Sequence, residues 1–151
     1  MRIEIRTADG MRRLGESLAA VAQPGDLIVL TGELGAGKTT LTQGIGAGLG
    51  VAGDVLSPTF VIARVHRGGR IPLVHADAYR LGSVEEIDDL DLDASLDESL
   101  TVVEWGAGLA ERLSGEHLEV TIERPASADD ETRAVTLRGV GSSWPARLAR
   151  L

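Results

Sequence analysis

One segment constrains the fold of this chain more than any other: residues 32–40, which read GELGAGKTT. They contain the spacing Gly-x-x-x-x-Gly-Lys-Thr, which ends on Lys38 and Thr39. The run LIVLT, residues 27–31, directly precedes the segment and has the composition of a strand buried in a parallel sheet. Apolar residues at four-residue intervals after the segment indicate a helix. A buried strand, a glycine-rich turn and a helix start in this order predict a phosphate-binding P-loop of the Walker A type.

The residues of this loop have separate chemical roles. Lys38 is expected to reach the β- and γ-phosphates of the nucleotide, and the Thr39 hydroxyl is expected to ligate Mg²⁺. Lys38 is also the one lysine among 15 basic residues, which indicates a position where a compact ammonium serves better than a planar guanidinium. The predicted cofactors are therefore ATP and Mg²⁺. The predicted nucleotide-binding residues of the loop are Glu33, Leu34, Gly35, Ala36, Gly37, Lys38, Thr39 and Thr40.

A magnesium ion in such a site also needs a carboxylate at the end of a neighbouring strand, and two strand ends offer one. The apolar run LTVVE ends on Glu104, and the run IPLVHAD ends on Asp77. We favour Glu104 as the magnesium ligand because its strand is the more apolar; the alternative is an acid that only caps a turn. Asp77 shares a strand face with His75, two residues before it. Three roles stay open for Asp77: orienting water, contacting magnesium, or a structural hydrogen bond.

The turn Ser57-Pro58-Thr59-Phe60 is a further candidate for nucleotide chemistry. Nucleotide switches sense the γ-phosphate with a threonine on a loop beside the phosphates, and Thr59 has that character. A hydroxyl-proline-hydroxyl turn can also simply lead into a strand. The residues alone leave both interpretations open.

The remaining patterns predict an α/β fold. Strands are expected at residues 3–5, 27–31, 60–65, 71–77 and 100–104, and helices over 11–21, over 41–49, from Ser83 and around Arg147. Strands that alternate with helices predict a parallel sheet. Late apolar alternation around the turn-rich loop PASADDE predicts an antiparallel hairpin. At 151 residues the chain has the size of one domain, 1–151, for which we expect a three-layer P-loop NTPase fold with a mainly parallel central sheet and a late antiparallel hairpin.

Composition excludes several classes of function. The chain has no cysteine, so thiolate metal sites and cysteine nucleophiles are excluded. A net charge of −8 argues against binding DNA or RNA independently, because phosphate contacts need clustered basic residues. The chain has no apolar run near 18 residues and no secretory signal pattern, so we expect no membrane association and a cytoplasmic location.

Four motifs together resemble one family. GELGAGKTT, SPTF, HADAYR and VEWG follow one another in this order in a chain of this size, and the set resembles the TsaE (YjeE) family. The likeness spans nearly the whole chain. It implies an α/β ATPase of bacterial tRNA threonylcarbamoyladenosine (t6A37) biosynthesis, which modifies adenosine 37 in tRNAs that read codons beginning with A.

The resemblance also implies partners and site residues. The family acts with TsaB and TsaD-type proteins, so tRNA would be reached only through partners, and hydrolysis would be slow alone and stimulated by them. Thr39 and Glu104 correspond to the magnesium ligands, Lys38 to the phosphate lysine, and Thr59 and Asp77 to residues needed for turnover. The N-terminal segment near Thr7 and the late hairpin at Arg133 correspond to further nucleotide contacts.

A small-molecule P-loop kinase is the main alternative. Such kinases share the loop and often carry an arginine-bearing lid, but the turn with Arg67 and Arg70 is too short to close over two substrates. A GTPase is a weaker alternative because its usual [NT]KxD motif needs a second lysine.

Overall fold

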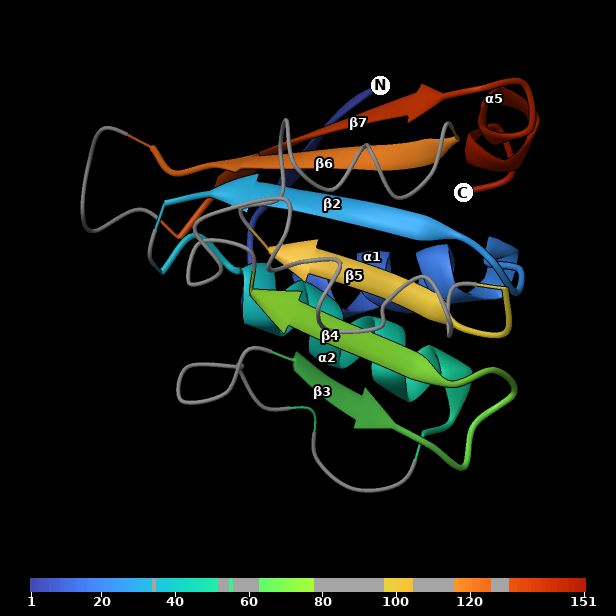
Figure 1. Ribbon diagram of the computed structural model, residues 1–151. Coiled ribbons are helices and arrows are strands. Elements are labelled where there is room, and N and C mark those ends of the chain that lie inside the picture. Colours follow the sequence, from blue (N-terminus) through green and yellow to red (C-terminus); the bar gives the residue numbers. More distant parts are fainter. Residues whose placement is uncertain (34, 52–54, 56–62, 78–96, 105–115, 126–130) are drawn as a thin grey trace.

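The computed structural model describes residues 1–33, 35–51, 55, 63–77, 97–104, 116–125 and 131–151. Within them, one sheet of seven strands has the order β1-β7-β6-β2-β5-β4-β3 (Figure 1). The strands are β1 (Arg2–Ile5), β2 (Leu27–Gly32), β3 (Ala63–His66), β4 (Leu73–Asp77), β5 (Leu100–Glu104), β6 (His117–Glu123) and β7 (Arg133–Val140).

The centre of the sheet is parallel, as the sequence predicts. Strands β4, β5, β2 and β6 are parallel neighbours, whereas β3, β7 and β1 join antiparallel at the flanks. The late antiparallel hairpin is the β6–β7 pair. The four parallel strands end at the same edge of the sheet, which we call the loop end, because the glycine-rich loop follows β2 there. The opposite edge is the far end.

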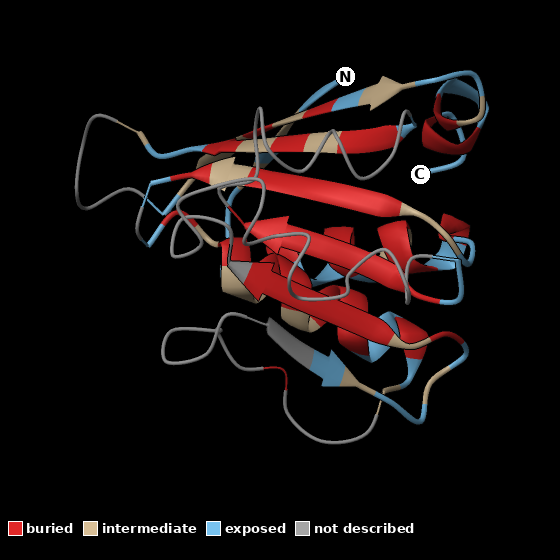
Figure 2. Cartoon of the chain, viewed as in Figure 1, coloured by how far each residue is buried: buried red, intermediate tan, exposed pale blue. Residues whose placement is uncertain are grey.

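Two long helices cover one face of the sheet. Helix α1 (Ala8–Val21) and helix α2 (Lys38–Leu49) lie behind the sheet in Figure 1, and the short α5 (Trp144–Leu148) follows β7. The apolar residues of β2, β5 and β6 that point to this face form one buried cluster with the helices (Figure 2). In the described part of the chain, no helix is long and apolar enough to cross a membrane.

Glycines let α1 and α2 approach closely. A Cβ on Gly15 of α1 would lie 2.3 Å from the Leu41 carbonyl oxygen, and a Cβ on Gly44 of α2 would lie 2.1 Å from the Arg12 carbonyl oxygen. Both distances are too short for any side chain, so the two backbones touch directly. Glycine lowers the helical propensity of α2, and this close packing offsets the loss.

The opposite sheet face is also buried, at Leu27, Val29, Val74 and Val103. The helix predicted from Ser83 lies outside the described residues. The strand predicted from Phe60 is described from Ala63 onward. The α/β class, the parallel centre and the late hairpin are confirmed.

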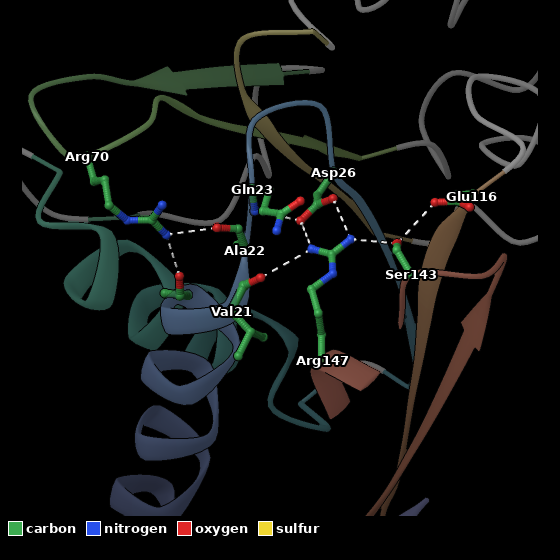
Figure 3. Close-up of polar contacts among 9 residues, drawn as sticks. Val21, Ala22, Gln23, Asp26, Arg70, Glu116, Ser143 and Arg147 are labelled. Carbon is green, nitrogen blue, oxygen red and sulfur yellow. Dashed lines mark hydrogen bonds and ion pairs between the residues drawn. The ribbon is translucent and has the colours of Figure 1, made fainter. Parts of the chain in front are cut away.

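Arg70 anchors α1 at the far end (Figure 3). It lies in the turn between β3 and β4, and its Nη2 donates to the carbonyls of Ala19 at 2.7 Å and Ala22 at 2.9 Å. Carbonyls at the end of a helix lack the usual donor four residues on, and the Ala19 carbonyl has only a long bond of 3.3 Å from the N–H of Ala22. The arginine therefore supplies a further donor at this helix end.

Arg147 of α5 makes a second anchor at the same end (Figure 3). It forms a bidentate pair with Asp26, donates to the Val21 carbonyl at 3.2 Å, and stacks over Trp144 at 3.9 Å from the ring centre. Arg147 is 6% exposed. The pair therefore ties the C-terminal helix to the end of α1 in a buried setting, where a bidentate charge-assisted contact is strong.

Glu116 extends this anchor toward solvent. Its carboxylate accepts from the backbone N–H of Ser142 at 3.1 Å and from the hydroxyl of Ser143 at 3.0 Å. These hydrogen bonds, the Ser142 backbone first, hold the pKa of Glu116 below its usual value. The segment between β7 and α5 is therefore held at the start of β6.

Candidate nucleotide-binding site

The predicted loop lies between β2 and α2, at the loop end of the sheet. β2 ends at Gly32, and α2 begins at Lys38 after Gly37, whose φ of 118° is in the left-handed region that favours glycine. The first turns of α2 thus direct their free N–H groups toward the loop, which is the arrangement that binds phosphate at helix N-termini.

Lys38 is held inside the loop by backbone oxygens. Its Nζ donates to the carbonyl of Gly32 at 2.6 Å and to the carbonyl of Glu33 at 3.2 Å, and the residue is 8% exposed. The ammonium is therefore placed at the centre of the loop. Its short contacts hold the loop in a defined shape before any phosphate is bound.

Two arginines of the β6–β7 hairpin lie beside the loop. Arg133 donates from Nε to the Ala36 carbonyl at 3.1 Å. The Nη1 of Arg124 lies 3.6 Å from the position that a Cβ on Gly35 would take. The chain has a net charge of −8, yet Lys38, Arg124 and Arg133 all meet at this loop. This local positive charge suits an anionic ligand.

The beginning of α1 lies on the same side. Thr7 is the N-cap of α1, and its hydroxyl accepts from the backbone N–H of Gly10 at 3.0 Å. Met11 follows one turn later, and its Cε lies 3.3 Å from the position of a Cβ on Gly37. The structure therefore brings the helix that Thr7 caps against the loop and gives the Thr7 hydroxyl a capping role.

Glu104 stands at the loop end next to β2. In the sheet register it pairs with Leu30 of β2 on one side and with Asp77 of β4 on the other. Glu104 is 4% exposed, and it lies on the face that packs against the helices, because Val102 two residues earlier belongs to that core cluster. The carboxylate is thus buried beside the loop.

The described contact of the Glu104 carboxylate is with His75. The Nε2 of His75 lies 3.3 Å from Oε2 of Glu104, and the histidine is completely buried. Among the described residues, neither ring nitrogen makes a well-aligned hydrogen bond. A buried carboxylate needs a cation or hydrogen-bond donors to offset the loss of water, so this site favours binding a cation.

The donor set fits magnesium bound together with phosphates. The described residues contain no cluster of three or more His, Asp or Glu side chains that could enclose a metal ion. Mg²⁺ usually takes one or two protein ligands and completes its octahedron with water and phosphate oxygens. Glu104 and the hydroxyl of Thr39, on the first turn of α2, match that pattern.

The structure brings together most of the predicted site residues. Thr59 and Leu34 lie outside the described residues, and for Asp77 the register places the backbone beside Glu104. Arg70, weighed as part of a kinase lid, instead binds the end of α1 at the far end.

Sequence reasoning missed two features of the site. It proposed Arg133 through the family resemblance, and it did not single out Arg124 beside the loop. It noted His75 only as a neighbour of Asp77 on one strand face. The position of Arg124, one residue after the alternating run of β6, is the available signal, because β6 ends beside β2 at the loop.

Comparisons with known proteins agree with one another. Residues 5–135 match the family model described as threonylcarbamoyl adenosine biosynthesis protein TsaE. The chain is 56% identical over 138 residues to the tRNA threonylcarbamoyladenosine biosynthesis protein TsaE of Streptomyces coelicolor, covering 89% of this chain and 93% of that protein. It is 40% identical over 134 residues to the Bacillus subtilis protein of the same name, covering 88% of this chain and 82% of that protein.

A solved structure has the same fold. The crystal structure of Bacillus subtilis YdiB superimposes with a TM-score of 0.83 at 31% identity, covering 99% of this chain and 91% of that one.

Proposed function

The chain belongs to the TsaE family, and from this premise we propose that it is an Mg²⁺-dependent ATP hydrolase of tRNA threonylcarbamoyladenosine biosynthesis. The relatives carry the biosynthetic role in their names, and the chain covers most of their length. The hydrolase activity is an inference from the residues of the site.

One observation carries this inference: a buried carboxylate, Glu104, lies on the strand next to the one that leads into a Walker A loop. P-loop NTPases hold Mg²⁺ between a loop hydroxyl and a carboxylate on such a neighbouring strand. Here Thr39 follows the loop after β2 and supplies the hydroxyl, and Glu104 ends the neighbouring strand β5 and supplies the carboxylate.

Each side chain of the site would have its own role in the in-line attack of water on the γ-phosphate. Lys38 would leave the carbonyls of Gly32 and Glu33 for the β- and γ-phosphate oxygens, while the loop N–H groups bind the remaining phosphate oxygens. Thr39 and Glu104 would hold Mg²⁺, which supplies charge stabilisation between the phosphates. Asp77 and Thr59 are the candidates for positioning the attacking water.

Partner proteins would complete the site. We propose slow hydrolysis by the chain alone and faster hydrolysis with TsaB and TsaD-type proteins, which would also be the route to tRNA. Adenosine 37 of tRNAs that read codons beginning with A is the proposed target. A net charge of −8 supports this indirect route, because a polyanion is repelled by the chain as a whole.

The test is phosphate release from Mg·ATP by the purified chain, alone and with TsaB and TsaD-type subunits. Lys38→Ala is the blank, since it removes the phosphate-binding ammonium, and it should abolish productive binding. Glu104→Gln keeps the size of the side chain and removes its charge, so it should retain the fold but lose turnover.

Two results would overturn the proposal. Full-rate hydrolysis by Glu104→Gln would remove the magnesium assignment. ATP binding without phosphate release, even with partners present, would point to a small-molecule kinase that lacks its acceptor, and a screen for phosphorylated products would follow.

A further inference from the structure

We propose that His75 is a positioning residue that fixes the orientation of the Glu104 carboxylate for the metal. The inference rests on the proposed function and concerns the same site. The Nε2 of His75 lies 3.3 Å from Oε2 of Glu104, so one carboxylate oxygen faces the imidazole. The other oxygen, Oε1, is then the one available to a cation.

The burial of His75 argues for a specific partner. It lies on β4 between Leu73 and Asp77, and it pairs in register with Val102 of β5. Leu73 and Val102 are completely buried and belong to the apolar core cluster. A completely buried imidazole in apolar surroundings is unfavourable unless a polar group faces it, and Glu104 is the described group that does.

The surroundings of His75 favour one tautomer of its ring. Among the described residues, Nδ1 of His75 has no hydrogen-bond partner. The tautomer with hydrogen on Nε2 therefore suits the site, because this N–H can donate to Oε2 of Glu104 once the carboxylate tilts into line. Histidine and carboxylate then form an ordered pair, as outer-shell groups do around metal ligands.

The position of α2 indicates how far along the sheet Thr39 lies relative to this pair. Leu73 of β4 contacts Gly46 of α2, since its Cδ2 lies 3.6 Å from the position of a Cβ there. Thr39 comes about two turns before Gly46, about 10 Å along the helix, which equals about three residues of strand. Because α2 begins at the edge where β4 ends, Thr39 is thus level with the end of β4, and Glu104 lies at that level on the neighbouring strand.

Two isosteric variants test the proposal. Gln has its amide nitrogen where His75 has Nε2, whereas Asn has its amide nitrogen where His75 has Nδ1. His75→Gln therefore keeps a hydrogen-bond donor within reach of Glu104. His75→Asn removes that donor but introduces the same amide group. The readout is the binding of fluorescent N-methylanthraniloyl-ATP during a MgCl₂ titration, with a second measurement in EDTA.

His75→Asn should raise the Mg²⁺ concentration at half-saturation by about 10-fold or more, as loss of an outer-shell partner does, and His75→Gln should stay within about threefold of the unaltered chain. Both should bind the nucleotide equally in EDTA. A merely structural histidine would instead weaken binding in EDTA as well, or leave the two variants alike, and either result overturns the proposal.

Glu104→Gln separates the proposal from the proposed function. If Glu104→Gln leaves the Mg²⁺ requirement unchanged, the magnesium assignment fails and the role of His75 fails with it. If Glu104→Gln raises the requirement while His75→Asn does not, the magnesium site stands and only the positioning role is wrong.

Discussion

The replacement of Gly44 by alanine tests how the helix behind the nucleotide loop is held. A Cβ at this position would lie 2.1 Å from the carbonyl oxygen of Arg12 and 2.8 Å from its carbonyl carbon and Cα. All three are backbone atoms, so no side-chain rotation relieves the clash. To reach an ordinary contact of 3.4 Å, α1 and α2 must separate by about 1.3 Å at this point.

Two effects of opposite sign decide the magnitude. Forcing an extra methyl group into a close contact lowers the free energy of unfolding by about 1–3 kcal/mol. Alanine favours a helix more than glycine does, and this difference offsets up to about 1 kcal/mol of that loss. Because the added methyl meets three backbone atoms, we expect an overpacking cost of about 3 kcal/mol. After the helix-propensity gain of about 1 kcal/mol, the free energy of unfolding should fall by about 2 kcal/mol. At this chain length that loss lowers Tm by about 4–8 °C.

Urea unfolding of Gly44→Ala and Gly10→Ala, followed by circular dichroism, checks the expectation. Gly10 is the matched control in α1, where a Cβ would meet only the side-chain atoms Cγ2 of Ile5 at 3.3 Å and Oγ1 of Thr7 at 3.4 Å. We expect Gly10→Ala to leave stability unchanged or to raise it by up to about 1 kcal/mol, because alanine favours the helix and only side chains face the new methyl. If Gly44→Ala unfolds at the same urea concentration as this control, the close approach of the helices is not required.

Three further predictions concern the far end. Arg147→Ala should cost about 3 kcal/mol in urea unfolding, because the half-buried carboxylate of Asp26 loses its bidentate partner and keeps only the N–H of Gln23, and Asp26→Asn combined with Arg147→Met should cost less. Arg70→Ala should cost about 1.5 kcal/mol through two lost hydrogen bonds to α1, whereas Ala at the exposed Arg67 should cost nothing measurable. Hydrogen bonds from two serines lower the pKa of Glu116, so their stabilisation is full above the unfolded value of 4.5 and is lost as the pH falls through the lower folded pKa. Glu116→Gln should therefore lower Tm at neutral pH, and the difference should shrink as the pH falls below about 4.5.

Patterns within short segments explain what could be predicted from the sequence. Strand β5 was predicted with the bounds that the structure has, because an apolar run that stops at a carboxylate, Glu104, leaves little choice of end. The end of the helix predicted over 41–49 also agrees with the structure, where Gly50 follows with φ at 77°, in the left-handed region. Both predictions depend only on residues that are neighbours in the sequence.

Contacts between distant segments could not be predicted in this way. The pairing of His75 with Glu104 depends on the register between β4 and β5, and a shift of one residue would turn both side chains to other neighbours. The approach of Arg124 to the loop depends on the strand order, which places β6 directly beside β2. Neither register nor strand order has a local pattern in the chain.

The choice between arginine and lysine follows the acceptors that each residue meets. At the far end, Arg70 donates to two helix carbonyls and Arg147 to a carboxylate and a carbonyl, and a planar guanidinium can reach several oxygens at once. At the loop end, Lys38 meets the carbonyls of Gly32 and Glu33 within a turn that closes six residues along the chain. A compact ammonium can exchange those carbonyls for phosphate oxygens without moving the backbone, since its three hydrogens have no fixed plane. Under the proposed function, the single lysine therefore lies where the partner of the cation changes, whereas Arg70 and Arg147 lie where the partners stay the same.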